Sequence, residues 1–240
     1  MYIHGSGIIG DRKMYVLGAM LAHHQGALFT SLREQLNARG FVVASIDYQL
    51  PLTRPGWRRS RTPSARRGLV RAHAADLGID PNRIGVWSSS GRSQLSSLLG
   101  LAGSEARFDR DQYSDQSSAV QAAVDMFGPA DLTDFDDSAP FGRFIVQVTL
   151  GRSTAARRSA SPITYIGPDA PPFLILQGTE DSLVRPHQSA EFAQRLQTAG
   201  VPTTLIDVQG TGHILDTPGQ RQSPDELTTT IIDFLTTTLR

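Results

Sequence analysis

Short apolar runs alternate along the chain with stretches whose apolar residues recur at helical spacing. Several of these runs, such as FVVASI and FLIL, are apolar almost throughout, which is typical of strands buried on both faces of a sheet. Strands that alternate with helices predict a mostly parallel sheet with helices on both sides. The sequence therefore predicts an α/β fold.

The periodicity also locates the expected elements. We expect strands at Tyr2–His4, Phe41–Asp47, Arg83–Trp87, Ala119–Met126, Pro172–Gln177 and Thr203–Val208. We expect helices at Ala27–Arg39, Ala65–Leu77, Gln94–Leu101, Gln188–Ala199 and Asp225–Leu239. Because 240 residues suffice for one sizeable core, we predict a single domain over residues 1–240.

Composition argues against several classes of protein. Lys plus Arg and Asp plus Glu both total 23, so net charge gives no attraction to nucleic acid or to an anionic membrane. There is no cysteine, which removes disulfides, thiolate metal sites and cysteine nucleophiles. No apolar run approaches the roughly 20 residues that span a bilayer. We therefore expect neither a nucleic-acid partner nor a membrane partner.

An arginine-rich run and a pair of histidines could suggest binding sites, but both are better explained as solvent-exposed surface segments. Residues 54–71 are rich in arginine, yet they contain one aromatic residue and no nucleic-acid module, which favours a solvated loop over a phosphate-binding patch. The adjacent His23 and His24 have no third ligand at helical spacing, so we expect no metal site there.

The first residues, MYIHGSG, look like the end of a buried strand that enters a glycine loop. A domain seldom begins in the middle of a sheet, so we expect sequence upstream of Met1 in the natural protein. The resulting exposed sheet edge makes a homo-oligomer a possible state. No charged segment followed by an apolar one opens the chain, which favours a cytoplasmic location.

Reactive residue types follow the predicted strands, at the edge where open parallel sheets place their sites. HGSG follows the first strand, SSSG follows RIGVW, TED follows FLILQG, and TGH follows TLIDVQG. A serine, a carboxylate and a histidine thus occur in the order characteristic of α/β-hydrolases. A serine hydroxyl becomes a strong nucleophile when a histidine accepts its proton, and a carboxylate fixes the tautomer of that histidine.

These stretches resemble the α/β-hydrolase superfamily and, within it, esterases related to hormone-sensitive lipase and to bacterial feruloyl and acetyl esterases. The matching stretches, in the family's order, are YIHGSG, GFVVASIDYQL, AADLGIDPNRIGVW, AVDMFGPADL, SPITYI, PPFLILQGTEDSLVRPHQS and GTGH. The resemblance implies an α/β-hydrolase fold that lacks the first family strands. It also implies a serine hydrolase that needs neither an organic cofactor nor a metal.

The resemblance assigns the catalytic residues. GVWSSSGRSQLSSLLG matches the family pattern GVWGxSAGGHLAALLG with Ser90 as the nucleophile, and Ser89 is the adjacent alternative. Similarity to GTxD assigns the acid to Asp181, and similarity to GxGH assigns the base to His213. Asp207 and Asp216 are weaker candidates for the acid because neither follows a GTxD pattern.

The resemblance also predicts an oxyanion hole, formed by the backbone N–H groups of Gly5, Ser6 and Gly91, with His4 holding the first loop. Ser88 and Arg92 stand where the family has glycines. We expect Arg92 either to turn outward from the elbow or to displace the nucleophile.

We therefore expect a serine carboxylic-ester hydrolase that acts on small-molecule esters. Because only the segment Ala130–Ser161 is available to cover a pocket, we expect small or aromatic acyl groups. One alternative is a non-catalytic α/β-hydrolase-like binding protein with a degraded nucleophile elbow. Another is a peptidase or an arylformamidase of the same fold.

Overall fold

The computed structural model describes residues 2–3, 31–44, 70–102, 116–117, 119–135, 140–215 and 217–240. Several sequence predictions concern residues outside these ranges. They are His4, Gly5 and Ser6 of the expected oxyanion loop, His23 and His24, the arginine-rich run as far as residue 69, and Asp216.

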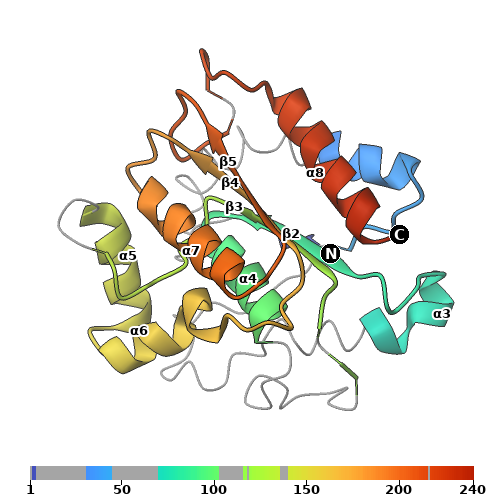
Figure 1. The fold of residues 1–240 in the computed structure, drawn as a ribbon, viewed down its shortest axis with the longest axis horizontal. Coiled ribbons are helices and arrows are strands. Elements are labelled where there is room, and N and C mark those ends of the chain that lie inside the picture. Colours follow the sequence, from blue (N-terminus) through green and yellow to red (C-terminus); the bar gives the residue numbers. More distant parts are fainter. Residues whose placement is uncertain are drawn as a thin grey trace.

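A parallel sheet forms the centre of the described structure, with its strands in the order β1-β2-β3-β4-β5. The strands are β1 (Tyr2–Ile3), β2 (Gly85–Ser89), β3 (Ala122–Met126), β4 (Phe173–Gly178) and β5 (Thr203–Val208). Each neighbouring pair is parallel, so the carboxyl ends of the strands meet at one edge of the sheet (Figure 1). The predicted mostly parallel sheet is confirmed, and β5 has the predicted bounds.

Helices cover both faces of this sheet (Figure 1). One face carries α8 (Pro224–Thr238) and the helix over residues 31–38, and the other carries α4 (Ser93–Leu101) and α7 (Pro186–Thr198). Residues 70–72 and α3 (Ala74–Leu77) form further helical turns before β2. In the part of the chain described above, no helix is both long and apolar enough to cross a membrane.

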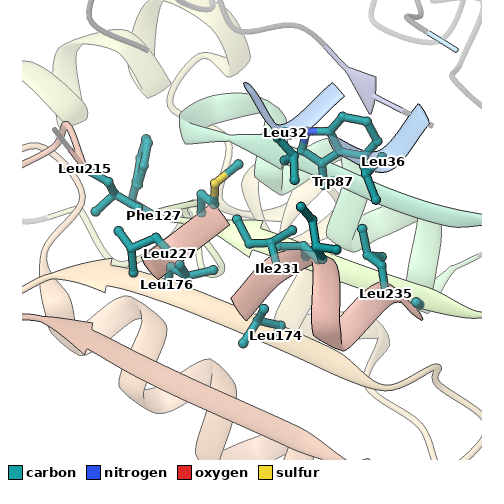
Figure 2. Close-up of a cluster of buried hydrophobic side chains, with 14 of the residues drawn as sticks. Leu32, Leu36, Trp87, Phe127, Leu174, Leu176, Leu215, Leu227, Ile231 and Leu235 are labelled. Atoms are coloured by element: carbon teal, nitrogen blue, oxygen red, sulfur yellow. The ribbon is translucent and has the colours of Figure 1, made fainter. Parts of the chain in front are cut away.

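The two faces of β4 explain its almost continuous apolar run. Successive side chains of a strand point to opposite faces. Leu174 and Leu176 therefore join the cluster beneath α8, whereas Phe173 and Ile175 join the cluster beneath α7. Figure 2 shows the α8 cluster, in which Leu32, Leu36 and Trp87 lie opposite the leucine and isoleucine side chains of α8.

Two segments differ from the predictions. Residues 41–44 form neither helix nor strand, and the remainder of the predicted strand Phe41–Asp47 lies outside the described ranges. The segment between β3 and β4 contains α5 (Pro140–Leu150) and α6 (Thr154–Ala160), which were not predicted. The sequence of α5, PFGRFIVQVTL, holds a glycine and several β-branched residues, which disfavour a helix locally. Packing of Val146 against Leu132 and Phe135 accompanies the helix and outweighs this preference.

Candidate active site

A sharp turn connects β2 to α4. The strand ends at Ser89, the 3-10 turn η4 covers Ser90–Arg92, and α4 begins at Ser93. Ser90 has a φ of 58°, in the left-handed region that residues other than glycine seldom adopt. Such local strain is common at functional sites and is part of the nucleophile elbow of α/β-hydrolases. The turn places Ser90 at the carboxyl edge of the sheet.

The structure brings Ser90, His213 and Asp181 together in a hydrogen-bonded chain. Ser90 Oγ lies 2.7 Å from His213 Nε2, and His213 Nδ1 lies 2.8 Å from Asp181 Oδ2. The Asp181 side chain is fully buried, and the His213 side chain is 14% exposed. With the proton on Nδ1, the imidazole donates to Asp181 and accepts the Ser90 hydroxyl at Nε2. This arrangement can activate a serine hydroxyl as a nucleophile.

The other candidates lie elsewhere. Ser89, the alternative nucleophile, is the buried last residue of β2. Asp207 is an exposed residue of β5, the edge strand of the described sheet. Gly91 directly follows Ser90 in the turn, whereas the two other expected oxyanion residues, Gly5 and Ser6, lie outside the described residues. Within the described ranges, no group of three or more histidine, aspartate or glutamate side chains could hold a metal ion.

The expectation for Arg92 is wrong. Its side chain is only 3% exposed, so it does not turn outward, and Ser90 still contacts His213. Ser88, at another of the family's glycine positions, is fully buried and its hydroxyl hydrogen-bonds to the Ser96 hydroxyl. Ser96 Oγ also donates to the Arg92 carbonyl at 3.1 Å. The elbow therefore accommodates Ser88 by pairing its hydroxyl with that of Ser96 in α4.

Gln177, which sequence reasoning did not identify, contacts the buried carboxylate of Asp181. Its Nε2 donates to Asp181 Oδ2 at 3.2 Å and to the Val184 carbonyl at 3.1 Å. Ser189 Oγ donates to Gln177 Oε1 at 2.7 Å, which orients the amide. Asp181 Oδ1 accepts the backbone N–H groups of Leu183 and Val184, each at 2.9 Å. A buried carboxylate needs such donors, and here they hold it in register with His213.

We expect Gln177→Met to lower the free energy of unfolding by about 2 kcal/mol, because buried acceptors, among them Asp181 Oδ2 and the Val184 carbonyl, lose their shared donor. We also expect a lower kcat, because Asp181 is then held less firmly against His213. Urea denaturation and ester turnover measure the two effects. Gln194→Met, which changes an exposed glutamine of α7, is the matched control and should alter neither. Equal behaviour of the two variants would contradict the role of Gln177.

Phe127, just after β3, packs against the catalytic candidate His213. The two ring centroids are 4.8 Å apart and the rings meet edge to face at 66°. Phe127 has a φ of 46°, so it too lies in the left-handed region. The turn is held by the buried Asp125, whose Oδ1 accepts the Gly128 N–H at 2.8 Å and whose Oδ2 accepts the Ser97 hydroxyl at 2.6 Å. A Cβ at Gly128 would come within 2.6 Å of Asp125 Oδ1, so this turn requires glycine there.

Burial raises the pKa of the Asp125 carboxyl above its ordinary value of 3.8, although the hydrogen bonds from Ser97 and Gly128 act in the opposite direction. Because the folded protein holds the Asp125 proton more tightly than the unfolded chain, the protonated carboxyl favours the folded state. This contribution to the free energy of unfolding is fully present below the unfolded-state pKa and is lost as pH rises through the folded-state pKa. Asp125→Asn abolishes this titration and keeps an acceptor for the Gly128 N–H.

We therefore expect the free energy of unfolding of the wild type, minus that of Asp125→Asn, to fall as pH rises from about 4 toward neutrality. Urea denaturation of both proteins at a series of pH values measures this difference. A difference that stays constant or increases with pH would contradict the assignment.

Comparison with known proteins identifies the family. The BD-FAE family model matches residues 1–196. LipM of Mycobacterium tuberculosis, a probable carboxylic ester hydrolase, is 32% identical over 161 residues, which are 64% of this chain and 37% of LipM. Esterase LipC of the same organism is 28% identical over 220 residues, which are 88% of this chain and 55% of LipC. The chain thus spans only about a third to a half of the length of these two relatives.

A solved structure, the truncated form of a carbohydrate esterase from gut microbiota, has the same fold. It superposes with a TM-score of 0.73 at 24% identity and covers 99% of this chain and 84% of its own. The expected α/β-hydrolase fold and the resemblance to its esterases are confirmed. The chain belongs to the BD-FAE family of α/β-hydrolase esterases.

Proposed function

We propose that the protein is a serine carboxylic-ester hydrolase. The observation that carries the proposal is the chain of hydrogen bonds from Ser90 Oγ through His213 to Asp181. Ser90 Oγ attacks the ester carbonyl while His213 Nε2 takes the hydroxyl proton. Asp181 keeps the Nδ1 proton in place and stabilises the imidazolium that forms. His213 then gives its proton to the alkoxide as the C–O bond to the alcohol breaks, which leaves an acyl-serine.

Water completes the reaction by the same route. His213 Nε2 takes a proton from the water as its oxygen attacks the acyl-serine carbonyl, and it returns the proton to Ser90 Oγ as the acid leaves. Both steps pass through an oxyanion, which needs preorganised N–H donors. The backbone N–H of Gly91 fits this role by its place after Ser90, and Gly5 and Ser6 are the proposed partners.

The proposed substrates are small-molecule esters with small or aromatic acyl groups. In the described part of the segment between β3 and β4, the α-helices are short: α5 has 11 residues and α6 has 7 residues. Helices of this length leave little material to form a large cap over a pocket. The names of the relatives, an esterase and a carbohydrate esterase among them, agree with an ester rather than an amide substrate.

Turnover of p-nitrophenyl esters of increasing acyl length, alongside the matching p-nitroanilide, tests the proposal. We expect saturable hydrolysis of the acetate, slower hydrolysis of long acyl chains, and far slower cleavage of the amide. Ester turnover no faster than in buffer would instead support a non-catalytic binding protein. Preferred cleavage of the amide would support a peptidase of the same fold.

A further inference from the structure

The hydroxyl of Ser93 connects the two strand ends that flank the candidate site. The side chain is fully buried at the first position of α4. Its Oγ donates to the carbonyl of Ser88 at 2.6 Å and accepts the backbone N–H of Met126 at 3.0 Å. A hydroxyl has one proton to donate and lone pairs to accept with, so it can make both bonds at once.

Each of these backbone partners is close in sequence to one side of the contact between Ser90 and His213. Ser88 lies two residues before Ser90, at the end of β2. Met126 directly precedes Phe127, whose ring packs against His213. The Ser93 hydroxyl thus ties the strand end that carries the nucleophile to the turn that supports the base.

Both ends of this connection are conformationally demanding. Ser90 and Phe127 are the non-glycine residues of the described chain with a positive φ, at 58° and 46°. Such conformations persist only where the surrounding structure over-determines them. The same oxygen atom bonds to the backbone two residues before Ser90 and directly before Phe127, and these two bonds contribute to that constraint.

The space around residue 93 is also restricted. A Cβ at Gly128 would collide with the Cβ of Ser93, so the β3 turn and α4 approach as closely as a serine and a glycine allow. The family pattern has glycine where this chain has Ser93, and glycine supplies no hydroxyl. The connection is therefore a feature of this chain's serine-rich elbow.

We propose that Ser93 is a positioning residue whose hydroxyl fixes the Ser90 elbow relative to the Phe127 turn and so sets the geometry between Ser90 Oγ and His213 Nε2. The inference rests on the proposed function, because it concerns the site that would perform it. Ser93 touches neither His213 nor the reacting atoms, and it acts through the backbone.

The test compares Ser93→Ala and Ser93→Gly with the wild type. Both remove the hydroxyl, and neither adds bulk beside Gly128. We expect kcat on p-nitrophenyl acetate to fall on the order of tenfold or more with KM changed less than about twofold, because misplacement by about 1 Å can cost a hundredfold in rate. Ile84→Val is the control for general destabilisation, since it removes a buried methylene just before β2, at the end of the strand opposite Ser90.

A second measurement does not depend on turnover. The ring resonances of His213, identified with a His213→Gln variant, report the environment of the imidazole by NMR. We expect Ser93→Ala and Ser93→Gly to shift them and Ile84→Val to leave them in place. Unshifted resonances in the Ser93 variants would overturn the inference, whether or not the protein hydrolyses esters.

The kinetic outcomes separate the two proposals. Full kcat in Ser93→Ala, beside an inactive Ser90→Ala, would overturn the role of Ser93 and leave the esterase proposal intact. An equal loss of kcat in Ile84→Val would also overturn it, because general destabilisation would then explain the effect. Equal turnover by the wild type and Ser90→Ala would overturn the esterase proposal, and the NMR comparison would still decide the role of Ser93.

Discussion

Ser90→Ala is expected to lower kcat on p-nitrophenyl acetate by about 10⁵- to 10⁶-fold, the scale on which serine hydrolases lose activity without their nucleophile. The hydroxyl lies 2.7 Å from His213 Nε2, and no other described side chain is hydrogen-bonded to that nitrogen. Alanine keeps the Cβ and is strained at a φ of 58° about as much as serine, so the turn should persist. A residual rate above that in water is expected from the oxyanion donors alone.

Ser89→Ala is the matched control for this prediction. It removes a hydroxyl from the preceding residue, at the buried end of β2, and should leave kcat within a few-fold of the wild type. Circular dichroism and thermal melts of both variants check that the fold is kept. An active Ser90→Ala beside an inactive Ser89→Ala would move the nucleophile to Ser89.

Asp181→Asn is expected to lower kcat by about 10⁴-fold. The asparagine side chain has the same shape, and its oxygen can still accept the N–H groups of Leu183 and Val184. Its NH2 group, however, then faces His213 Nδ1 and favours the tautomer with the proton on Nε2. In that tautomer Nε2 cannot accept the Ser90 proton, so kcat should fall. The NH2 group also replaces the oxygen that accepts from Gln177 Nε2, so the free energy of unfolding should fall as well.

The control for Asp181 is Asp207→Asn, which makes the same chemical change at the exposed β5 residue that was the weaker candidate for the acid. The initial rates of Asp207→Asn at saturating substrate should match those of the wild type within about twofold. A large loss in Asp207→Asn with little change in Asp181→Asn would contradict the assignment of the acid.

Much of the fold could be predicted from the sequence, because it depends on local periodicity. The predicted bounds of β4 and β5 agree with the structure to within a residue at each end. For β4 the reason is that a strand buried on both faces has few polar positions. The order of reactive residue types pointed to a serine, a carboxylate and a histidine, because parallel strands bring their carboxyl ends together however far apart they are in sequence. The resemblance to esterases then selected Ser90, Asp181 and His213.

The predictions missed what depends on particular side-chain contacts and not on periodicity. α5 has a sequence with weak helical preference, and only its packing against the loop after β3 accounts for it. Nothing in the sequence distinguishes Gln177 from other residues at the end of a buried strand. Its role follows from the hydrogen bond to Asp181, which only the structure shows. The burial of Arg92 was missed because a charged side chain at a glycine position of the family pattern is expected to turn toward solvent.

Covalent labelling with a fluorophosphonate probe, followed by intact-mass analysis and peptide mapping, tests the central claim most directly. An activated serine oxygen attacks the phosphorus and displaces fluoride, so the adduct marks the nucleophile itself. We expect one adduct per chain on Ser90 in the wild type, slow labelling of Asp181→Asn, and none in Ser90→Ala. An adduct on any other residue, or an unlabelled wild-type protein, would contradict the assignment of Ser90, His213 and Asp181 as a catalytic triad.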